Sequence, residues 1–229
     1  MMERVSDRGD LVSRARQSLG TSSDAIYQLV GALLCKRRTS GVVADVGCGT
    51  GNLLRALGSQ FSRSIGVDAV RYDGLPSGVD FRPVDLDAGR LPLEDGEADV
   101  VAAVETIEHL ENPRAFCREL TRGTRAGGWV VITTPNQLSL LSLTTLVVKH
   151  RFSAFQDTAY PAHRTALLEV DLRRMAAECD LRDVEVHFTC RGRMPLSAGH
   201  FPGALARRFP RALSDNVVLI GRKPGPGHS

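Results

Sequence analysis

The sequence predicts an α/β fold: a doubly wound sheet of seven strands, mostly parallel, with helices on both faces. Short apolar runs alternate with segments of helical periodicity, which is typical of such sheets. Residues 42–57 have the pattern of a buried strand, a glycine turn and a helix, the repeating unit of this architecture. Two late strands with little helix between them indicate an antiparallel edge.

The predicted strands are short apolar or alternating runs bounded by glycine, proline or polar residues. Pro83 lies inside the third of them and indicates a strand that lies towards an edge or ends early, because proline cannot donate to a ladder. The predicted strands span residues 42–46, 65–68, 81–86, 98–104, 129–134, 184–189 and 217–220.

The predicted helices follow from apolar residues at helical spacing and from capping signals. N-cap residues at 21–24 precede the first helix, which is expected to stop near the basic run 36–38. Asn112 and Pro113 form an N-cap and a first-turn proline before another helix, which Gly127–Gly128 is expected to close. The predicted helices span residues 26–34, 52–57, 114–122 and 165–179.

The length of 229 residues suits one α/β domain, which we expect over residues 1–223. Residues 1–40 are expected to form an N-terminal helical cap, and residues 137–164 a substrate-side insertion or lid. The apolar side chains between 138 and 146 also suit plain core or a dimer contact, so monomer and homodimer both stay open. Residues 224–229 are expected to be a flexible tail.

Composition is ordinary for a globular chain, with 42% apolar and 24% charged residues. A net charge of +3 neither demands nor excludes an acidic partner. Five scattered cysteines without C-x-x-C spacing argue against a disulfide framework and for a reducing compartment, so we expect a cytoplasmic protein. The N-terminus is too charged for a signal peptide, and the longest apolar stretch, 138–148, is too short to span a membrane.

The glycine turn indicates a ligand that lies against the backbone, near the free N–H groups of a helix N-terminus. Asp68 follows Gly51 by 17 residues, at the tip of the second predicted strand, where a carboxylate can accept both ribose hydroxyls of an adenosine. These signals fit a dinucleotide or S-adenosylmethionine, while the alternative is a glycine-rich turn without a ligand. The spacing Asp45-x-Gly47-x-Gly49-x-Gly51 is not G-x-G-x-x-G, and it resembles the first motif of class I S-adenosylmethionine-dependent methyltransferases.

Further motifs extend this resemblance to the group related to the ubiquinone O-methyltransferases. They lie at 85–86, 91–101, 105–110, 127–128 and 134–136, so the resemblance covers about residues 40–136, with a weaker match over 160–223. It implies a Rossmann-like sheet with an antiparallel C-terminal edge, and S-adenosyl-L-methionine as cofactor. The cofactor-binding residues that it implies are Asp45, Gly47, Cys48, Gly49, Gly51, Asp68, Asp85, Leu86 and Glu105.

Asp85 and Leu86 come at the end of the third predicted strand, over the same cleft. Asp85 can accept from an adenine amino group while Leu86 packs on the ring. An equally good interpretation makes Asp85 a turn residue before Asp87-Ala88-Gly89.

A second constellation, Glu105-x-x-Glu108-His109, follows the fourth predicted strand, where an acceptor must approach the methyl group. If the segment is helical, the three side chains share a face. Two carboxylates and an imidazole suit Mg²⁺, Mn²⁺ or Zn²⁺, and His163 is the best candidate for a fourth ligand, with His150 second. The pattern is also similar to the metal-binding motif of the Hen1 RNA 2′-O-methyltransferases.

Two readings without a metal stay open for the same residues. In one, His109 is a catalytic general base and Glu108 assists it. In the other, Glu108 and His109 only orient their neighbours. A divalent ion, by contrast, would lower the pKa of a substrate hydroxyl so that its oxyanion can attack.

The function expected from these patterns is O-methylation of a small molecule, such as a phenol, a sugar or a lipid-linked precursor. The alternative is RNA ribose 2′-O-methylation of the Hen1 type, but 5% aromatic residues and a small net charge speak against RNA without excluding it. A short-chain nicotinamide oxidoreductase needs a Tyr with Lys four residues on. Gly31, Pro76 and Arg164 stand there instead, so we reject this class.

Overall fold

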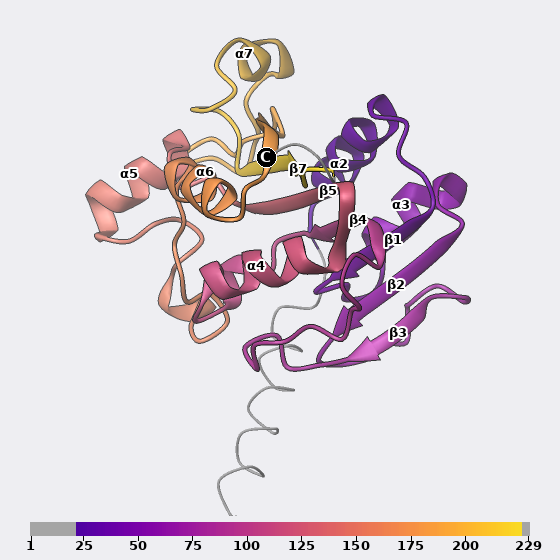
Figure 1. The fold of residues 1–229 in the computed structure, drawn as a ribbon. Coiled ribbons are helices and arrows are strands. Elements are labelled where there is room, and N and C mark those ends of the chain that lie inside the picture. The colour runs from indigo at the N-terminus through magenta and orange to yellow at the C-terminus, as the bar shows by residue number, and fades with distance from the viewer. Residues whose placement is uncertain (1–21, 226–229) are drawn as a thin grey trace, which may run out of the picture.

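The computed structural model describes residues 22–225, which form a seven-stranded sheet with the strand order β3-β2-β1-β4-β5-β7-β6 (Figure 1). The first five strands pair in parallel, and β7 pairs antiparallel with both β5 and β6. The predicted fold class, including its antiparallel C-terminal edge, is therefore confirmed. The strands are β1 (Val42–Val46), β2 (Arg63–Asp68), β3 (Asp80–Pro83), β4 (Ala98–Ala103), β5 (Thr124–Pro135), β6 (Arg182–Phe188) and β7 (Asn216–Arg222).

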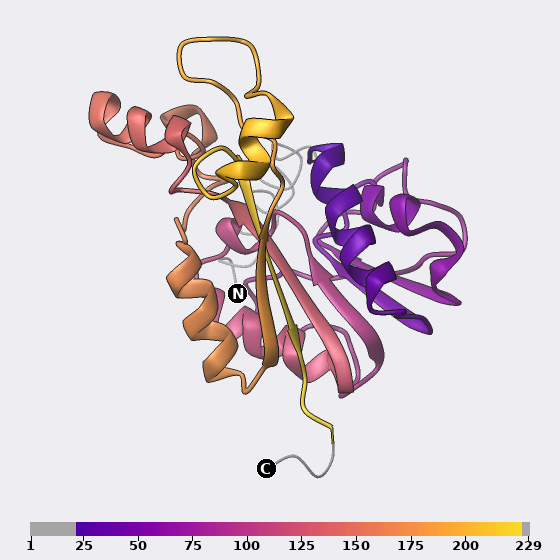
Figure 2. The ribbon, with the colours of Figure 1, turned by 90° about the horizontal axis from the view of Figure 1, so that it is seen from above.

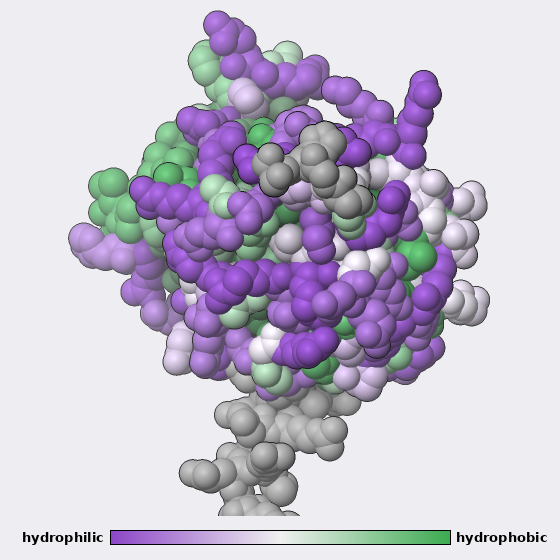
Figure 3. All heavy atoms as spheres, in the orientation of Figure 1, coloured by the Kyte–Doolittle hydropathy of each residue, from purple (hydrophilic) through white to green (hydrophobic). Residues whose placement is uncertain are grey.

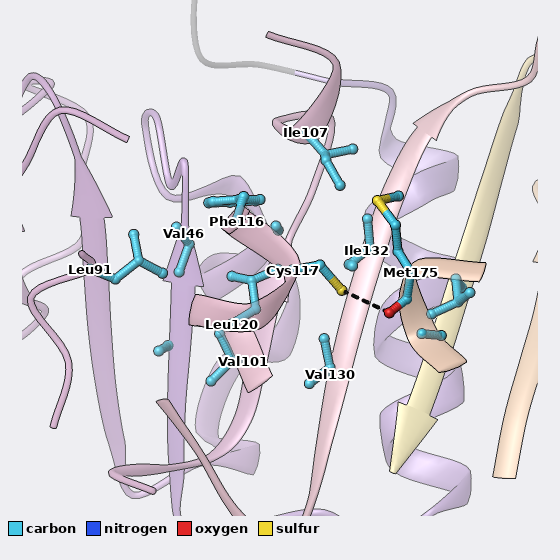
Figure 4. Packing of buried hydrophobic residues seen from close by; sticks show 14 of the residues in the cluster. Val46, Leu91, Val101, Ile107, Phe116, Cys117, Leu120, Val130, Ile132 and Met175 are labelled. Atoms are coloured by element: carbon cyan, nitrogen blue, oxygen red, sulfur yellow. Dashed lines mark hydrogen bonds between the residues drawn. The ribbon is translucent and has the colours of Figure 1, made fainter. Parts of the chain in front are cut away.

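Helices cover both faces of this sheet (Figure 2). One face packs against α2 and α3, whose apolar side chains include Ile26, Leu34 and Leu53. The other face packs against α4 and α6 through Phe116, Met175 and their neighbours (Figure 4). The α-helices are α2 (Asp24–Lys36), α3 (Asn52–Leu57), α4 (Pro113–Gly123), α5 (Leu140–Lys149), α6 (Glu169–Glu178) and α7 (Gly203–Arg208). The short 3-10 helices are η1 (Gly58–Gln60), η2 (Ile107–His109) and η3 (Asp157–Ala159).

Several boundaries differ from the predicted ones. β3 lies at the sheet edge, as Pro83 indicated, and it also ends at Pro83, so that Asp85 and Leu86 lie beyond it. α4 ends at Gly123, close to its predicted end at residue 122, and the Gly127–Gly128 pair lies inside β5, because the chain is already paired with β4 from Thr124. A register shift in β4 between Ala98 and Val100 accommodates the extra residues of β5.

The insertion 137–164 forms α5 and then an irregular loop around η3. Ser139 caps α5 by accepting from the backbone N–H of Ser142, at 3.2 Å. The interpretation of its apolar residues as plain core is wrong for Leu140 and Leu143, which are 41% and 40% exposed. Hydrophobic surface over α5 is visible at the left of Figure 3.

Within residues 22–225, no helix combines the length and apolar character needed to cross a bilayer. The predictions for residues 1–21 and for most of the tail, 226–229, lie outside the described residues.

Candidate active site

The glycine turn after β1 closes tightly at the carboxyl end of the parallel strands. Gly47, Gly49 and Gly51 have φ values of 79°, 50° and 81°, a region that glycine adopts without strain. A Cβ atom on Gly47 would lie 2.2 Å from the hydroxyl oxygen of Thr106. That hydroxyl donates to the carbonyl oxygen of Val46 at 3.2 Å, so Thr106 is hydrogen-bonded to the last residue of β1, next to the turn.

Two carboxylates lie beside the turn, at the ends of β1 and β2. Asp68 accepts hydrogen bonds from the backbone N–H groups of Gly49 (2.8 Å) and Ala69 (2.7 Å). Burial raises the pKa of Asp68, and burial together with the Asp68 charge raises the pKa of Asp45 to about 8. Asp68 therefore supports the turn, and its oxygens keep lone pairs with which to accept from a ligand hydroxyl.

The other candidate cofactor residues have different surroundings. Cys48 is buried, and burial raises the pKa of its thiol. Asp85 accepts from the backbone N–H of Asp87 at 3.0 Å, which is the turn role considered as an alternative. Leu86 is partly buried against the larger core cluster.

Glu105 does not share a helical face with the residues that follow it. It has a φ of 51°, and the 3-10 helix η2 begins only at Ile107. Its two carboxylate oxygens accept from the Thr133 hydroxyl (3.0 Å) and the Asn216 amide (2.8 Å). Burial raises the pKa of Glu105 to about 7 despite these hydrogen bonds. The Glu105 carboxylate is thus held by β5 and β7, and it does not lie on one helical face with Glu108 and His109.

Glu108, His109 and His163 do come together. One potential ligand atom from each lies within 4.8 Å of those of the others, and Glu105 and His150 are not members of this group. Glu108 is 0% exposed, and neither of its carboxylate oxygens has a hydrogen-bond partner of normal geometry within residues 22–225. Burial raises its pKa well above the ordinary value, although the nearby Thr134 hydroxyl counteracts part of this rise.

Both imidazoles are oriented by backbone carbonyls. Nδ1 of His109 lies 2.8 Å from the carbonyl oxygen of Ala162, and Nδ1 of His163 lies 2.6 Å from that of Ala154. A carbonyl only accepts, so each Nδ1 carries the proton and each Nε2 keeps its lone pair. Burial lowers the pKa of His109 to about 4, which leaves this ring neutral at physiological pH.

Backbone hydrogen bonds join the two segments that carry the cluster. The N–H groups of Arg164 and Thr165 donate to the carbonyl oxygen of Glu108 at 2.9 and 3.0 Å. The rings of Phe155 and His163 lie 5.4 Å apart between centroids, so the insertion packs directly against the cluster. The position of His163 is therefore fixed by main-chain contacts as well as by its own side chain.

These residues fit a divalent cation. A buried carboxylate without partners is costly unless a positive charge or a donor meets it. Two imidazoles whose Nδ1 atoms donate to carbonyl oxygens are the usual arrangement of metal-binding histidines. One carboxylate and two imidazoles suit Zn²⁺, and with added oxygen ligands they also suit Mg²⁺ or Mn²⁺.

Sequence reasoning missed several residues that shape this region. Thr106 supports the turn, and Thr133 and Asn216 hold Glu105. Tyr27 of α2 is buried, and the charges of Asp45 and Glu105 act on its hydroxyl, which places α2 beside the ligand end of the sheet. Thr106 lies inside the 105–110 motif but was given no role. The other positions carry no motif, although an aromatic residue with a hydroxyl on a helix that precedes a glycine turn could have drawn attention to Tyr27.

Comparison with known proteins places the glycine turn and the residues after β4 in one recognised domain. A family model described as a methyltransferase domain matches residues 44–132. The ubiquinone biosynthesis O-methyltransferase of Bordetella avium is 33% identical over 122 residues, which cover 49% of this chain and 48% of that protein. The chain therefore spans about half the length of this curated relative.

Two further comparisons cover more of the chain. A Mycolicibacterium smegmatis protein named "Probable S-adenosylmethionine-dependent methyltransferase" is 27% identical over 195 residues, covering 82% of this chain and 71% of that protein. The crystal structure of a SAM dependent methyltransferase from Archaeoglobus fulgidus superposes with a TM-score of 0.61 at 20% identity, covering 86% of this chain and 94% of that one. At this identity the structural likeness shows the fold alone.

Proposed function

We propose that this chain, which carries a class I S-adenosylmethionine-dependent methyltransferase domain, transfers a methyl group to a hydroxyl oxygen of a small molecule with the help of a divalent cation. The observation that carries the metal-assisted form is the group of Glu108, His109 and His163, in which a buried carboxylate lacks a partner within the described residues. The Bordetella avium relative is named as an O-methyltransferase, which supports oxygen as the acceptor atom.

The residues around the glycine turn would hold S-adenosylmethionine. Asp68, which lies beside the turn, would accept from the ribose hydroxyls, and the backbone from Gly47 to Gly51 would allow close approach of the ligand. The cofactor supplies an electrophilic methyl group when it is bound. The chain itself has to align the acceptor with that methyl group and to exclude water.

Glu108, His109 and His163 would hold the cation. When bound, it supplies Lewis acidity that lowers the pKa of a substrate hydroxyl. The chain supplies one negative charge from Glu108 and two lone pairs from the Nε2 atoms, while the carbonyl oxygens of Ala162 and Ala154 keep both rings in place.

Segment 137–164 would form the substrate-side lid. It brings His163 to the cluster and places Phe155 against that ring. Closure of this segment over a substrate would therefore also complete the cation site. The exposed apolar face of α5 lies in the same segment and gives the lid a surface suited to an apolar acceptor.

An assay of labelled methyl transfer tests the proposal. The acceptors are a catechol, a simple phenol, a free sugar and a short RNA duplex, each with and without a chelator. We expect label on a small-molecule hydroxyl, loss of turnover in chelator, and recovery on adding Mg²⁺ or Mn²⁺. Transfer to RNA alone would identify a ribose methyltransferase. Full turnover in chelator, together with an inactive His109→Ala variant, would make His109 a general base and remove the metal.

Metal binding can be tested without turnover. Calorimetric titration of the metal-free chain with Zn²⁺ or Mn²⁺ should show one site, and His163→Ala should weaken it by at least about tenfold. His150→Ala is the matched control, because His150 ends α5 and lies outside the cluster. Equal affinity in wild type and His163→Ala would show that His163 is not a ligand.

A further inference from the structure

A polar hollow lies at the opposite end of the sheet from the glycine turn. It has a volume of about 200 Å³ and lies where β1 and β4 begin and where β7 ends. Its lining includes four arginines, one aspartate and the only tryptophan of the chain. These residues are Arg37, Arg38, Arg125, Arg222, Asp99 and Trp129.

Two of the four arginines have acidic partners. Arg37 pairs with Glu185 of β6, and Arg125 pairs with Asp99. The second oxygen of Asp99 accepts from the backbone N–H of Val42 at 2.7 Å, so this carboxylate is fully engaged. The acidic groups at the hollow are thus already used by the protein itself.

The other two arginines leave positive charge uncompensated. Within residues 22–225, neither Arg38 nor Arg222 makes an ion pair with an acidic side chain. Arg222 donates only from Nε, to the carbonyl oxygen of Gly127 at 3.2 Å, which leaves its terminal nitrogens available. Arg182 lies directly opposite Arg222 on the neighbouring strand β6, and like charges in that position repel.

Trp129 contacts two of the arginines that line the hollow. The guanidinium carbon of Arg37 lies 4.8 Å from the centre of its ring, and that of Arg222 lies 5.9 Å away. Trp129 is also paired with Arg222 in the β5–β7 ladder. An anion that binds Arg222 would therefore change the surroundings of the Trp129 indole.

We propose that the hollow binds the phosphate group of a small ligand, with Arg38 and Arg222 as its principal donors. Four arginines and two paired carboxylates, those of Asp99 and Glu185, leave two positive charges, which match a phosphate dianion. Planar guanidinium groups bind phosphate oxygens in pairs. A volume of about 200 Å³ holds a phosphate or a diphosphate rather than a nucleic-acid strand.

The single tryptophan allows a direct test. Trp129 emission is followed while inorganic phosphate or pyrophosphate is added, with sodium chloride at matched ionic strength as the reference. We expect a saturable change with the phosphates only. The double variant Arg38→Ala/Arg222→Ala should weaken binding by at least about tenfold, since it removes charge-assisted hydrogen bonds. The matched control is Arg90→Ala/Arg118→Ala, which removes the same charge from exposed positions elsewhere.

Two further arms keep the outcome decisive. Arg38 is exposed and makes no side-chain hydrogen bond within the described chain, so Arg38→Ala alone should fold normally and still lose affinity. S-Adenosylmethionine binding should be unchanged in every variant, because the hollow lies at the other end of the strands. Equal phosphate affinity in wild type and in both arginine variants would overturn the proposal. So would saturable binding of a short RNA but not of pyrophosphate.

Discussion

The imidazole rings of His109 and His163 meet edge to face, with their centroids 4.8 Å apart and their planes at 66°. One ring follows β4 and the other comes from the insertion before α6. The carbonyl oxygen of Glu108 accepts from two N–H groups of the His163 segment, so the main chain holds the two rings together. The cluster is preorganised, and its buried carboxyl group, Glu108, has a raised pKa because burial disfavours its charged form.

The first prediction concerns the pH dependence of stability in the metal-free chain. Because the pKa of Glu108 is raised in the folded state, the folded chain binds this proton more tightly than the unfolded chain does. Stability therefore falls as pH rises from the ordinary value of 4.5 towards the raised one, by about 1.4 kcal/mol per pH unit. Glu108→Gln removes this loss, so its stability relative to wild type should be greater at neutral pH than at about pH 5.

Urea unfolding in chelator at both pH values measures this difference. Adding Zn²⁺ or Mn²⁺ should reverse the order, because a bound cation stabilises the wild-type carboxylate. Wild type and Glu108→Gln with parallel pH profiles would mean that Glu108 is already neutralised by another group.

The second prediction concerns cofactor affinity. Asp68→Ala should weaken the binding of S-adenosylmethionine by roughly 1.5–3 kcal/mol, the range for a hydrogen bond to a charged group. Asp73→Ala is the control, because Asp73 is an exposed carboxylate in the following loop. Calorimetry measures both, and an unchanged affinity in Asp68→Ala would place the ribose elsewhere.

The third prediction separates steric contact from backbone strain in the turn. Gly47→Ala places a Cβ atom 2.2 Å from the Thr106 hydroxyl oxygen at a φ of 79°, whereas Gly58→Ala meets nothing within 4 Å at a φ of 55°. Gly58→Ala should cost about 1–3 kcal/mol from backbone strain alone, and Gly47→Ala more, with loss of cofactor binding. Thermal unfolding gives the stabilities. Similar melting temperatures for the two variants would show that Thr106 can move aside.

The fourth prediction concerns the thiols of Cys117 and Cys179, which share a hydrogen bond with their sulfur atoms 3.5 Å apart. This hydrogen bond lowers the pKa of the half-buried Cys179 to about 7. Its alkylation by iodoacetamide should therefore rise with pH around a midpoint near 7, because the thiolate is the nucleophile. Cys117→Ala should raise that midpoint. Mass spectrometry of the labelled peptide follows the reaction, and an unchanged midpoint in Cys117→Ala would assign the effect to other neighbours.

The strand pattern was predictable because burial on both faces leaves a clear record in the sequence. Val43, Ala44 and Val46 are fully buried in a central parallel strand, and such strands consist of continuous apolar runs. Pro83 indicated the sheet edge because proline has no N–H group to donate to a neighbouring strand. The start of β5 at Thr124 was missed because Gly127–Gly128 is the more conspicuous signal, whereas strand pairing that begins at Thr124 depends on β4.

The site was predictable only where residues follow a strand directly. Gly47, Asp68 and Glu108 come just after the ends of parallel strands or at them, so topology alone brings them to one edge. The positive φ of Glu105 leaves no trace in the sequence, and it turns that carboxylate towards Thr133 and Asn216. Asn216 belongs to a strand far along the chain, and local patterns carry no information about such a partner.

The place of β7 in the sheet has a consequence for how the protein is made. Within residues 22–225, β6 pairs only with β7, although β7 is synthesised after it. On a translating ribosome, the β1–β5 part of the sheet can assemble as it emerges, while β6 waits without a ladder partner. Asn216, at the start of β7, then supplies the amide that fixes Glu105. A nascent chain that has not yet reached β7 would therefore carry the glycine turn and the histidine cluster but would lack the amide that holds Glu105. The ligand end of the sheet is thus complete only after β7 has been made.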